Sequence, residues 1–434
     1  MKKTKNAITA LFLCMIAFFC VLGVHADDGK GMLSPAFDVL SEQQKTVKSG
    51  LIYENVKFTL TDFKQYLGIS ALDHITVTKA PVATDGTLVV GSMTVGDGQR
   101  IDASLLQMLT FVPASSDVEI ATFSFCGDES TSGAEIECTV KMLHSVNYAP
   151  TVAQVHENRL LLNALNGKST GGTLVASDPE GDSMSFEIVE YPTHGYLRLC
   201  DGDGGEYVYT SYESYTGTDS FKYVAKDEYG NYTTPATVTI DVARDRTGVE
   251  FADMKGSHDL SAASVLVSER IISVIARADG VYFSPEDKVS RADFIVMAMK
   301  AAKKAPRKDS GALDGVSDAQ TIEGQPRDYI STAIEYGYLD IEESPDGAKI
   351  IRADEPITKA EAAKILSGIC GYLTVAEDIA VFADFYGIDA QTARCISAMY
   401  EYGVIEFDGG MISPNSCVTR ETCARMLYRL MNVA

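Results

Sequence analysis

Three related segments in the last part of the chain limit the possible folds more than any other feature of the sequence. Each opens with a short motif that ends in aspartate, and these residues, Asp253, Asp318 and Asp384, stand about 65 positions apart. From about residue 250, Ala, Met, Ile and Leu follow one another at helical spacing. The repeat predicts three helical units that bury their apolar faces against one another, because no single unit could do so alone.

Each unit contains a second recognisable helix start. Ser290 and Thr358 are good N-cap residues, and Asp293 and Glu361 follow three positions later. The pair Thr358 and Glu361 is a capping box, in which each partner bonds a backbone N–H of the other. The sequence therefore predicts helices that begin directly after residues 290 and 358.

A basic residue occupies the first turn of all three second helices. These residues are Arg291, Lys359 and Arg420. A cation is disfavoured at a helix N-terminus, which carries a partial positive charge. Its threefold occurrence suggests use, since a basic side chain beside exposed N–H groups can bind a carboxylate or phosphate. The alternative that remains open is a purely structural helix cap.

This pattern resembles the S-layer homology repeat. The third unit carries Phe382-Ala383-Asp384, then Tyr402-Gly403-Val404, then Ser413-Pro414 and Thr419-Arg420-Glu421. The resemblance covers about residues 249–433 and implies an all-α triplet with a pseudo-threefold arrangement, divided into repeats at 249–308, 314–375 and 380–434.

The resemblance also implies a function and a set of ligand residues. Such triplets anchor proteins non-covalently to the secondary cell-wall polysaccharide of Gram-positive bacteria, which often carries pyruvate. By position, the polysaccharide-binding residues would be the three basic ones and the three aspartates: Arg291, Lys359, Arg420, Asp253, Asp318 and Asp384.

Three departures from the family pattern are visible. The chain has no Trp, Thr422 stands where Glu is typical, and the first unit has no clear glycine turn beyond Asp279-Gly280. We therefore expect one or two of the three binding grooves to be silent.

The region from residue 50 to 243 has the character of β-structure. It is rich in Val, Ile, Thr, Tyr and Phe, with turn residues at short intervals. Two copies of one order of strands follow each other, at 50–147 and 148–243, which predicts two β-sandwich modules of the immunoglobulin type. The second copy resembles cadherin-like and bacterial Ig-like repeats, through Asn147-Tyr148-Ala149-Pro150, the acidic turn at 178–182 and Asp227 before Gly230.

Four acidic residues of the second copy could hold a calcium ion. Asp178, Glu180, Asp182 and Asp227 lie in predicted turns, and Ca²⁺ prefers oxygen ligands of this kind. A solvated acidic loop is the competing interpretation. No other cofactor is indicated.

The N-terminus predicts export. A basic start and an apolar run are typical of a signal peptide at 1–26, followed by a linker at 27–49; an uncleaved membrane anchor is the alternative. No later segment predicts a membrane span. Seven cysteines follow, with no zinc spacing, and Cys126 and Cys138 could pair across a hairpin. The formal net charge of -23 argues against nucleic-acid binding.

Catalytic signals are weak. The stretch Gly167-Lys168-Ser169-Thr170-Gly171 has the spacing of a nucleophile elbow, but a strand pattern follows where a helix is needed. A basic run, from Lys300 to Lys308, is interpreted as a solvated linker that could attract an anionic glycan over a distance.

The sequence therefore predicts an exported, non-enzymatic surface protein associated with the cell wall or S-layer. Its β-sandwich modules would form a stalk or adhesion region whose partner the sequence does not indicate. The alternatives are an adhesin for which the helical part is only a tether, a structural S-layer component and a wall-associated enzyme.

Overall fold

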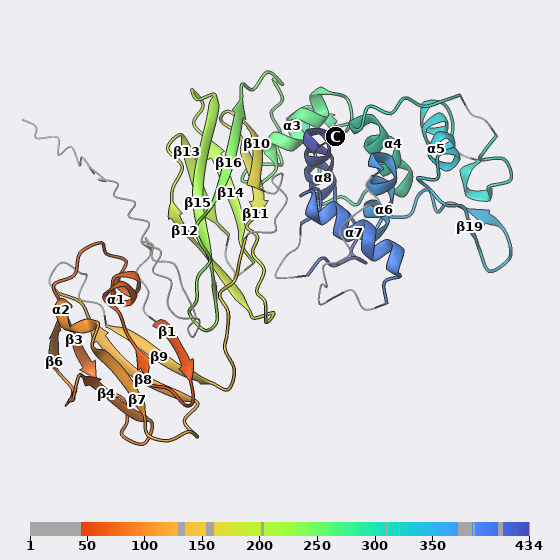
Figure 1. Ribbon diagram of the computed structural model, residues 1–434. Helices are drawn as coiled ribbons and strands as arrows, with labels where there is room; N and C mark the ends of the chain where they lie inside the picture. The colour runs from red at the N-terminus through yellow and green to blue at the C-terminus, as the bar shows by residue number, and fades with distance from the viewer. Residues whose placement is uncertain are drawn as a thin grey trace, which may run out of the picture.

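The structure is a computed structural model that describes residues 45–128, 135–152, 160–200, 204–308, 311–320, 322–371, 384, 387–406 and 411–433. Two β-sandwich modules are followed along the chain by a helical region (Figure 1). The predicted signal peptide lies outside the described residues. The first module begins with a strand at Lys45, inside the stretch predicted as a linker.

The first module contains a five-stranded sheet in the order β1-β9-β8-β3-β6 and a four-stranded sheet in the order β2-β7-β4-β5. The strands are β1 (Lys45–Leu51), β2 (Val56–Lys57), β3 (His74–Lys79), β4 (Gly86–Val90), β5 (Met93–Thr94), β6 (Gln99–Asp102), β7 (Leu109–Pro113), β8 (Ile120–Cys126) and β9 (Ile136–Leu143). Two short helices accompany them, α1 (Leu60–Leu67) and α2 (Ala103–Leu106).

Helix α1 is absent from the predicted all-β pattern. Its start carries a full capping box between Thr59 and Asp62, and its end uses Gly68 in the left-handed conformation. The helix packs Phe63 against Phe58 and Phe125, with ring centroids 5.6 and 5.0 Å apart. Its apolar face therefore supplies part of the module's core.

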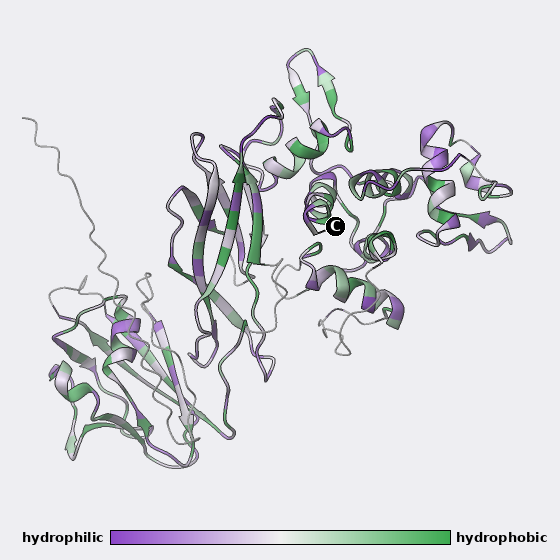
Figure 2. Cartoon of the chain, turned by 45° about the horizontal axis from the view of Figure 1, so that its top comes forward, coloured by the Kyte–Doolittle hydropathy of each residue, from purple (hydrophilic) through white to green (hydrophobic). Residues whose placement is uncertain are grey.

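The second module contains a four-stranded sheet in the order β10-β16-β15-β12 and a three-stranded sheet in the order β11-β14-β13. The strands are β10 (Leu161–Leu165), β11 (Ser169–Thr173), β12 (Met184–Glu190), β13 (Gly195–Leu199), β14 (Glu206–Ser211), β15 (Gly217–Asp227) and β16 (Ala236–Ala243). Hydrophobic and hydrophilic residues alternate along these strands, as expected for a sandwich (Figure 2).

Seven strands of the first module correspond to the seven of the second in sheet and order, with β5 and β6 added in the first, which confirms the predicted internal repeat. In each, the first strand pairs in parallel with the last, β1 with β9 and β10 with β16. The glycines that open β4 and β13 occupy equivalent places. A Cβ atom on Gly86 would lie 2.5 Å from the Phe111 ring, and one on Gly195 would lie 2.5 Å from the Tyr209 ring. Both positions need glycine because an aromatic ring of the neighbouring strand crosses them.

The core of the second module is aromatic. Tyr207 and Phe221 are buried and pack edge to face at 5.1 Å, and each contributes about 1.5–3 kcal/mol by burial. Phe186 is only partly buried and packs against this core from its margin.

The helical region contains six helices among the described residues, two in each predicted unit. They are α3 (Leu260–Ser268), α4 (Arg291–Ala301), α5 (Gln325–Glu335), α6 (Lys359–Cys370), α7 (Ala390–Glu401) and α8 (Arg420–Val433). Smaller elements are a 3-10 turn (Ser317–Ala319) and the hairpins of β17 (Ile275–Arg277) with β18 (Gly280–Tyr282) and of β19 (Glu342–Glu343) with β20 (Lys349–Ile350). The helices begin where the N-caps Ser290 and Thr358 predict.

The three units close into a ring. The second helix of each unit packs on the first helix of the next: α4 on α5, α6 on α7, and α8 on α3. At the centre, the N–H of Val289 donates to the carbonyl of Val418, that of Val418 to Ile357, and that of Ile357 to Val289, at 2.8–3.0 Å. These three bonds form a closed triangle, so the predicted pseudo-threefold arrangement of the helical units is present.

No disulfide bond links the cysteines among the described residues. Cys138 pairs in register with Phe123, while Cys126 pairs with Thr76 of β3. The predicted pairing of the two cysteines is therefore wrong, because they do not face each other across the hairpin. In the described part of the chain, none of the helices is both long and apolar enough to cross a bilayer.

Candidate functional site

The three basic residues predicted to bind polysaccharide lie at the junctions between helical units. The Arg291 guanidinium donates to the carbonyl of Arg352 at 2.6 Å, and Lys359 Nζ donates to the carbonyl of Ile412 at 3.1 Å. Arg420 Nε donates to the carbonyl of Phe283 at 2.7 Å and so closes the ring. Each cation therefore bonds a turn of the neighbouring unit.

Arg291 is the most enclosed of the three. It is only 6% exposed, and its Nη2 lies 2.5 Å from Glu361 Oε1, in the helix start of the second unit. A ligand-binding role would call for an exposed side chain, and the Arg291 side chain is not exposed. Lys359 and Arg420 are partly exposed.

The first-turn N–H groups are also occupied. The N–H groups of Arg291, Lys359 and Arg420 donate to the carbonyls of Glu355, Ser416 and Asp287 at 2.8–2.9 Å. The expectation of exposed N–H groups beside each cation is wrong, because backbone carbonyls of a turn in the neighbouring unit accept these N–H groups. The sequence could not show this, since the acceptors belong to other units.

The three repeated aspartates cap the same turns from the other side. Asp253 accepts the N–H groups of Phe283 and Ser284, at 2.8 and 2.6 Å. Asp318 accepts those of Ile351 and Ala353, and Asp384 accepts those of Ile412 and Ser413. The middle residues of these turns, Ser284, Arg352 and Ser413, all adopt the left-handed conformation.

Each junction thus has one plan. An aspartate holds the N–H groups of a turn in its own unit, and the basic residue of the preceding unit holds a carbonyl of that turn. The six predicted residues are brought together in pairs: Asp318 with Arg291, Asp384 with Lys359, and Asp253 with Arg420. Because the cations neutralise carbonyl dipoles there, these residues have a structural role at the junctions.

A second candidate site is the acidic cluster of the cadherin-like module. Carboxylate oxygens of Asp178, Asp182 and Asp227 all lie within 4.8 Å of one another. Asp227 is buried and accepts the side-chain N–H groups of Asn147 and Asn231, at 2.7 and 2.8 Å. Three of the four predicted calcium ligands are therefore brought together.

The fourth predicted ligand lies apart from the cluster. Glu180 accepts the backbone N–H of Tyr148 at 3.1 Å. The cluster stands where the two sandwiches meet, because Lys141 of β9 pairs with Glu228 at 3.0 Å and the backbone at Gly230 approaches Val47 of β1. A cation bound here would adjoin the connection between the modules.

The donor set fits a calcium ion. Asp178 Oδ2 and Asp182 Oδ2 are buried and have no hydrogen-bond partner among the described residues. Burial, together with the charges of Asp178 and Asp227, raises the pKa of Asp182. Three converging carboxylates, two of them with an unsatisfied oxygen, make a site that a hard cation preferring oxygen ligands would stabilise.

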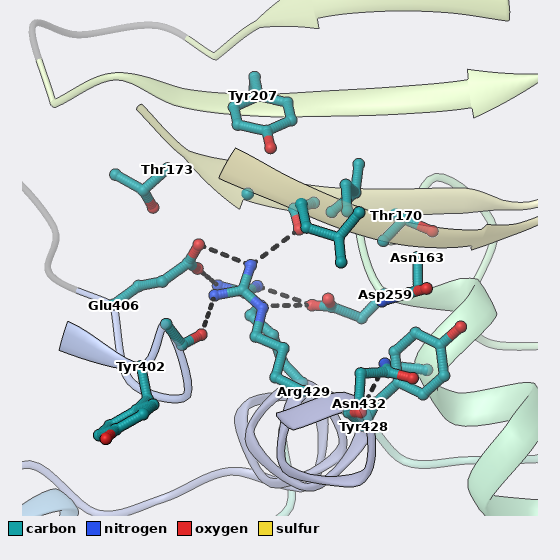
Figure 3. Close-up of a pocket in the computed structure, with 17 residues that line it drawn as sticks. Asn163, Thr170, Thr173, Tyr207, Asp259, Tyr402, Glu406, Tyr428, Arg429 and Asn432 are labelled. Atoms are coloured by element: carbon teal, nitrogen blue, oxygen red, sulfur yellow. Dashed lines mark hydrogen bonds and ion pairs between the residues drawn. The ribbon is translucent and has the colours of Figure 1, made fainter. Parts of the chain in front are cut away.

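A small pocket of about 40 Å³ lies where the second sandwich contacts the helical region (Figure 3). Arg425 donates to Asp259 at 2.9 and 2.7 Å and to Glu406 at 3.2 Å. Arg429 lies 2.6 Å from Glu406. Both carboxylates are thus paired with guanidinium groups, and the cluster has the character of a structural joint.

The stretch with nucleophile-elbow spacing belongs to this joint. Its last three residues begin β11, and Ser169 donates to the carbonyl of Ser257 at 2.6 Å. Lys168 pairs with Asp245 at 3.1 Å and donates to the carbonyl of Val249 at 2.9 Å. The motif therefore positions the sandwich on the helices, which explains its small and polar residues.

Residues 147–244 match the bacterial cadherin-like domain family, which confirms the predicted character of the second module. The sequence matches no curated protein. A bacterial cadherin-like domain fits an extracellular adhesion or stalk region.

Solved structures with similar parts have low overall likeness. An endo-fucoidan hydrolase of glycoside hydrolase family 107 is 17% identical, with 48% of this chain and 28% of that chain covered and a TM-score of 0.18. An adhesin, SrpA, from Streptococcus sanguinis is 15% identical over 32% of this chain and 88% of that chain, with a TM-score of 0.19. Drosophila N-cadherin EC1-3 is 13% identical, with 49% of this chain and 66% of that chain covered and a TM-score of 0.21. The chain spans less than a third of the hydrolase, and these likenesses carry no argument about activity.

Proposed function

We propose that this protein is an exported, non-catalytic surface protein that binds an acidic cell-wall polysaccharide through its helical ring. The observation that carries the proposal is the closed ring of three like units, each with a basic residue at a junction. The resemblance of these units to S-layer homology repeats supports the ligand class. The two sandwiches would act as a stalk or adhesion region.

In this proposal the six repeated residues build the junctions on which the glycan binds. Arg291 is buried in its junction, whereas Lys359 and Arg420 are partly exposed. We therefore expect the junctions of the second and third units to contribute more to glycan binding than that of the first. This agrees with the expectation of unequal grooves.

Calcium is a second part of the proposal. Asp178, Asp182 and Asp227 would hold the ion beside the connection between the sandwiches. The ion would neutralise the repulsion of three carboxylates and hold the turn at 227–231 against the first module. A stiff connection suits a stalk that must project from a surface.

Co-sedimentation of the full chain with purified Gram-positive cell walls tests the anchoring. Binding should be lost on walls from which the acidic polysaccharide has been extracted, and it should weaken at high salt because part of the contact is ionic. Equal binding to intact and extracted walls would contradict the proposal. An adhesin that uses only its sandwiches would give that result.

A further inference from the structure

An open pocket of about 440 Å³ lies at the meeting of all three helical units. It is lined by the residues that follow α3, the end of α4 and residues just beyond it, the start of α5, and Met431 of α8. Four of its lining residues are cations: Arg270, Lys300, Lys303 and Lys304. The sequence indicated a solvated linker for the basic run from Lys300 to Lys308. In the structure, three of its cations line one pocket.

The charges of this pocket are not balanced. Elsewhere in the helical region, Arg291 pairs with Glu361, Arg352 with Glu342, and Arg425 with Asp259. Among the described residues, none of the ion pairs includes any of the four cations of the pocket. Of the described residues that line the pocket, Glu269 alone is acidic. In a chain of net charge -23, this is a local concentration of positive charge.

Arg270 occupies a position that the other units give to glycine. It follows α3 with φ of 58°, where Gly337 follows α5 with φ of 71° and Gly403 follows α7 with φ of 72°. The hydrogen bonds of the two turns correspond. The two backbone N–H groups after Arg270 donate to the carbonyl of Leu266, and the two after Gly337 donate to the carbonyl of Ala333. The missing glycine turn of the first unit is therefore present, with arginine in its place.

Lys303 repeats this substitution at the end of the second helix. It stands 303 − 291 = 12 positions after the first residue of α4, and Gly371 stands 371 − 359 = 12 positions after that of α6. Their φ angles are 54° and 72°. The left-handed backbone conformation is disfavoured for a residue that carries a Cβ atom, but it is readily adopted by glycine.

Two strained cations at glycine positions, both facing one unbalanced pocket, indicate a use for the charge. We propose that this pocket binds an anionic group of the wall polysaccharide, a carboxylate or phosphate carried on a sugar. The identity of the polysaccharide rests on the proposed function above. The buried Tyr329 forms part of the wall, with Lys300 Nζ 6.0 Å from its ring centroid, and the pocket also includes Gln325 at the start of α5.

The site differs from the junction residues in location and in construction. Arg291, Lys359 and Arg420 stand at the starts of the second helices and bond neighbouring turns, whereas the pocket lies at the ends of α3 and α4. The counterparts of Arg270 are Gly337 and Gly403, and those of Lys303 are Gly371 and Asn432. None of these residues is a cation, so the pocket belongs to one place in the ring.

The test is the double variant Arg270→Gly with Lys303→Gly in the full chain, measured by wall co-sedimentation and by titration with polygalacturonate, inorganic phosphate and neutral dextran. Arg270→Gly installs the residue that both other units use, and Lys303→Gly installs the residue that the second unit uses. The melting temperature should therefore stay equal or rise. Affinity for walls and for polygalacturonate should fall roughly tenfold or more, with no binding to dextran. Competition by phosphate at low concentration would identify phosphate, rather than carboxylate, as the preferred group.

The matched control is Lys364→Gln in α6, which removes a partly exposed cation that pairs with Asp340 and does not line the pocket, and it should leave the affinity unchanged. A second variant, Lys300→Gln within α4, tests the charge without changing a turn and should also weaken binding. Wild-type affinity in both the double variant and Lys300→Gln would contradict the proposed role of the pocket, while leaving the proposed anchoring to the wall intact. If the wild type fails to bind walls, the proposed function fails; the pocket then stands if polygalacturonate or phosphate binds and falls if neither does.

Discussion

Arg429 of α8 donates to the carbonyl oxygen of Gly171 in β11 at 3.0 Å, across 258 positions of sequence. The same guanidinium bonds the carbonyl of Gly403 and pairs with Glu406. One residue thus ties the last helix of the ring to a strand of the cadherin-like module. The sandwich and the ring are therefore joined by specific contacts as well as by the chain.

Removal of the neighbouring Arg425 should destabilise this joint strongly. The side chain of Asp259 is 1% exposed and that of Glu406 is 10% exposed, so Arg425→Met leaves a buried carboxylate without its cation. Such a loss costs about 3–5 kcal/mol, measurable by urea unfolding. The control, Lys222→Ala, breaks the exposed pair with Glu190 and should cost less than about 1 kcal/mol. Equal effects would show that the joint carries little stability.

Calcium should stabilise the chain through the acidic cluster. At a concentration 100 times its dissociation constant, a bound ion adds about 2.7 kcal/mol, so chelation should lower the melting temperature. In chelator, Asp182→Asn should be at least as stable as the wild type, because it removes one of three mutually repelling charges. It should gain little on addition of calcium. Glu180→Gln, which changes a residue outside the cluster, should keep the wild-type response; a full response in Asp182→Asn would contradict the assignment.

Asp219 should make the second module sensitive to acid. Burial alone would raise its pKa, but hydrogen bonds from the His194 N–H and the Tyr209 hydroxyl contribute to a pKa below the ordinary value. Because the folded pKa lies below the unfolded one of about 4, the stabilisation is present above pH 4 and is lost as pH falls through the folded value.

The measurement is urea unfolding of the wild type and Asp219→Asn between pH 7 and pH 3. The variant should be less stable at neutral pH, and the difference should shrink as the pH falls below about 4. The exposed Asp241 provides the control through Asp241→Asn, which should have the smaller effect. A difference that stays constant over the whole range would contradict the role of Asp219.

The sequence predicted elements whose signals are local. The strands of both sandwiches follow from the alternation of apolar and polar residues, and the starts of α4 and α6 follow from Ser290 and Thr358. Helix α1 escaped prediction although Thr59 and Asp62 signal it, because β-like segments surround it.

The junctions and the pocket could not be predicted in the same way. Arg291 donates to the carbonyl of Arg352, 61 positions away, and the sequence around Arg291 gives no indication of that acceptor. Arg270 occupies a turn position that carries glycine in the other two units. Because the first unit has arginine there, the glycine signal for a turn is missing from its sequence. Only the closed ring shows that Arg270 and Lys303 face the same space.

The three junction cations should separate structural from ligand-binding roles. Arg291→Met removes a buried cation that is paired with Glu361, so we expect the largest loss of stability, about 3 kcal/mol. Lys359→Met and Arg420→Met remove partly exposed cations and should cost roughly 1–2 kcal/mol each. Wall binding, measured at a temperature where all variants are folded, should follow the opposite order, with Lys359→Met and Arg420→Met weakened most. If the loss of binding instead follows the loss of stability, these residues only hold the ring together, and the glycan must bind elsewhere on it.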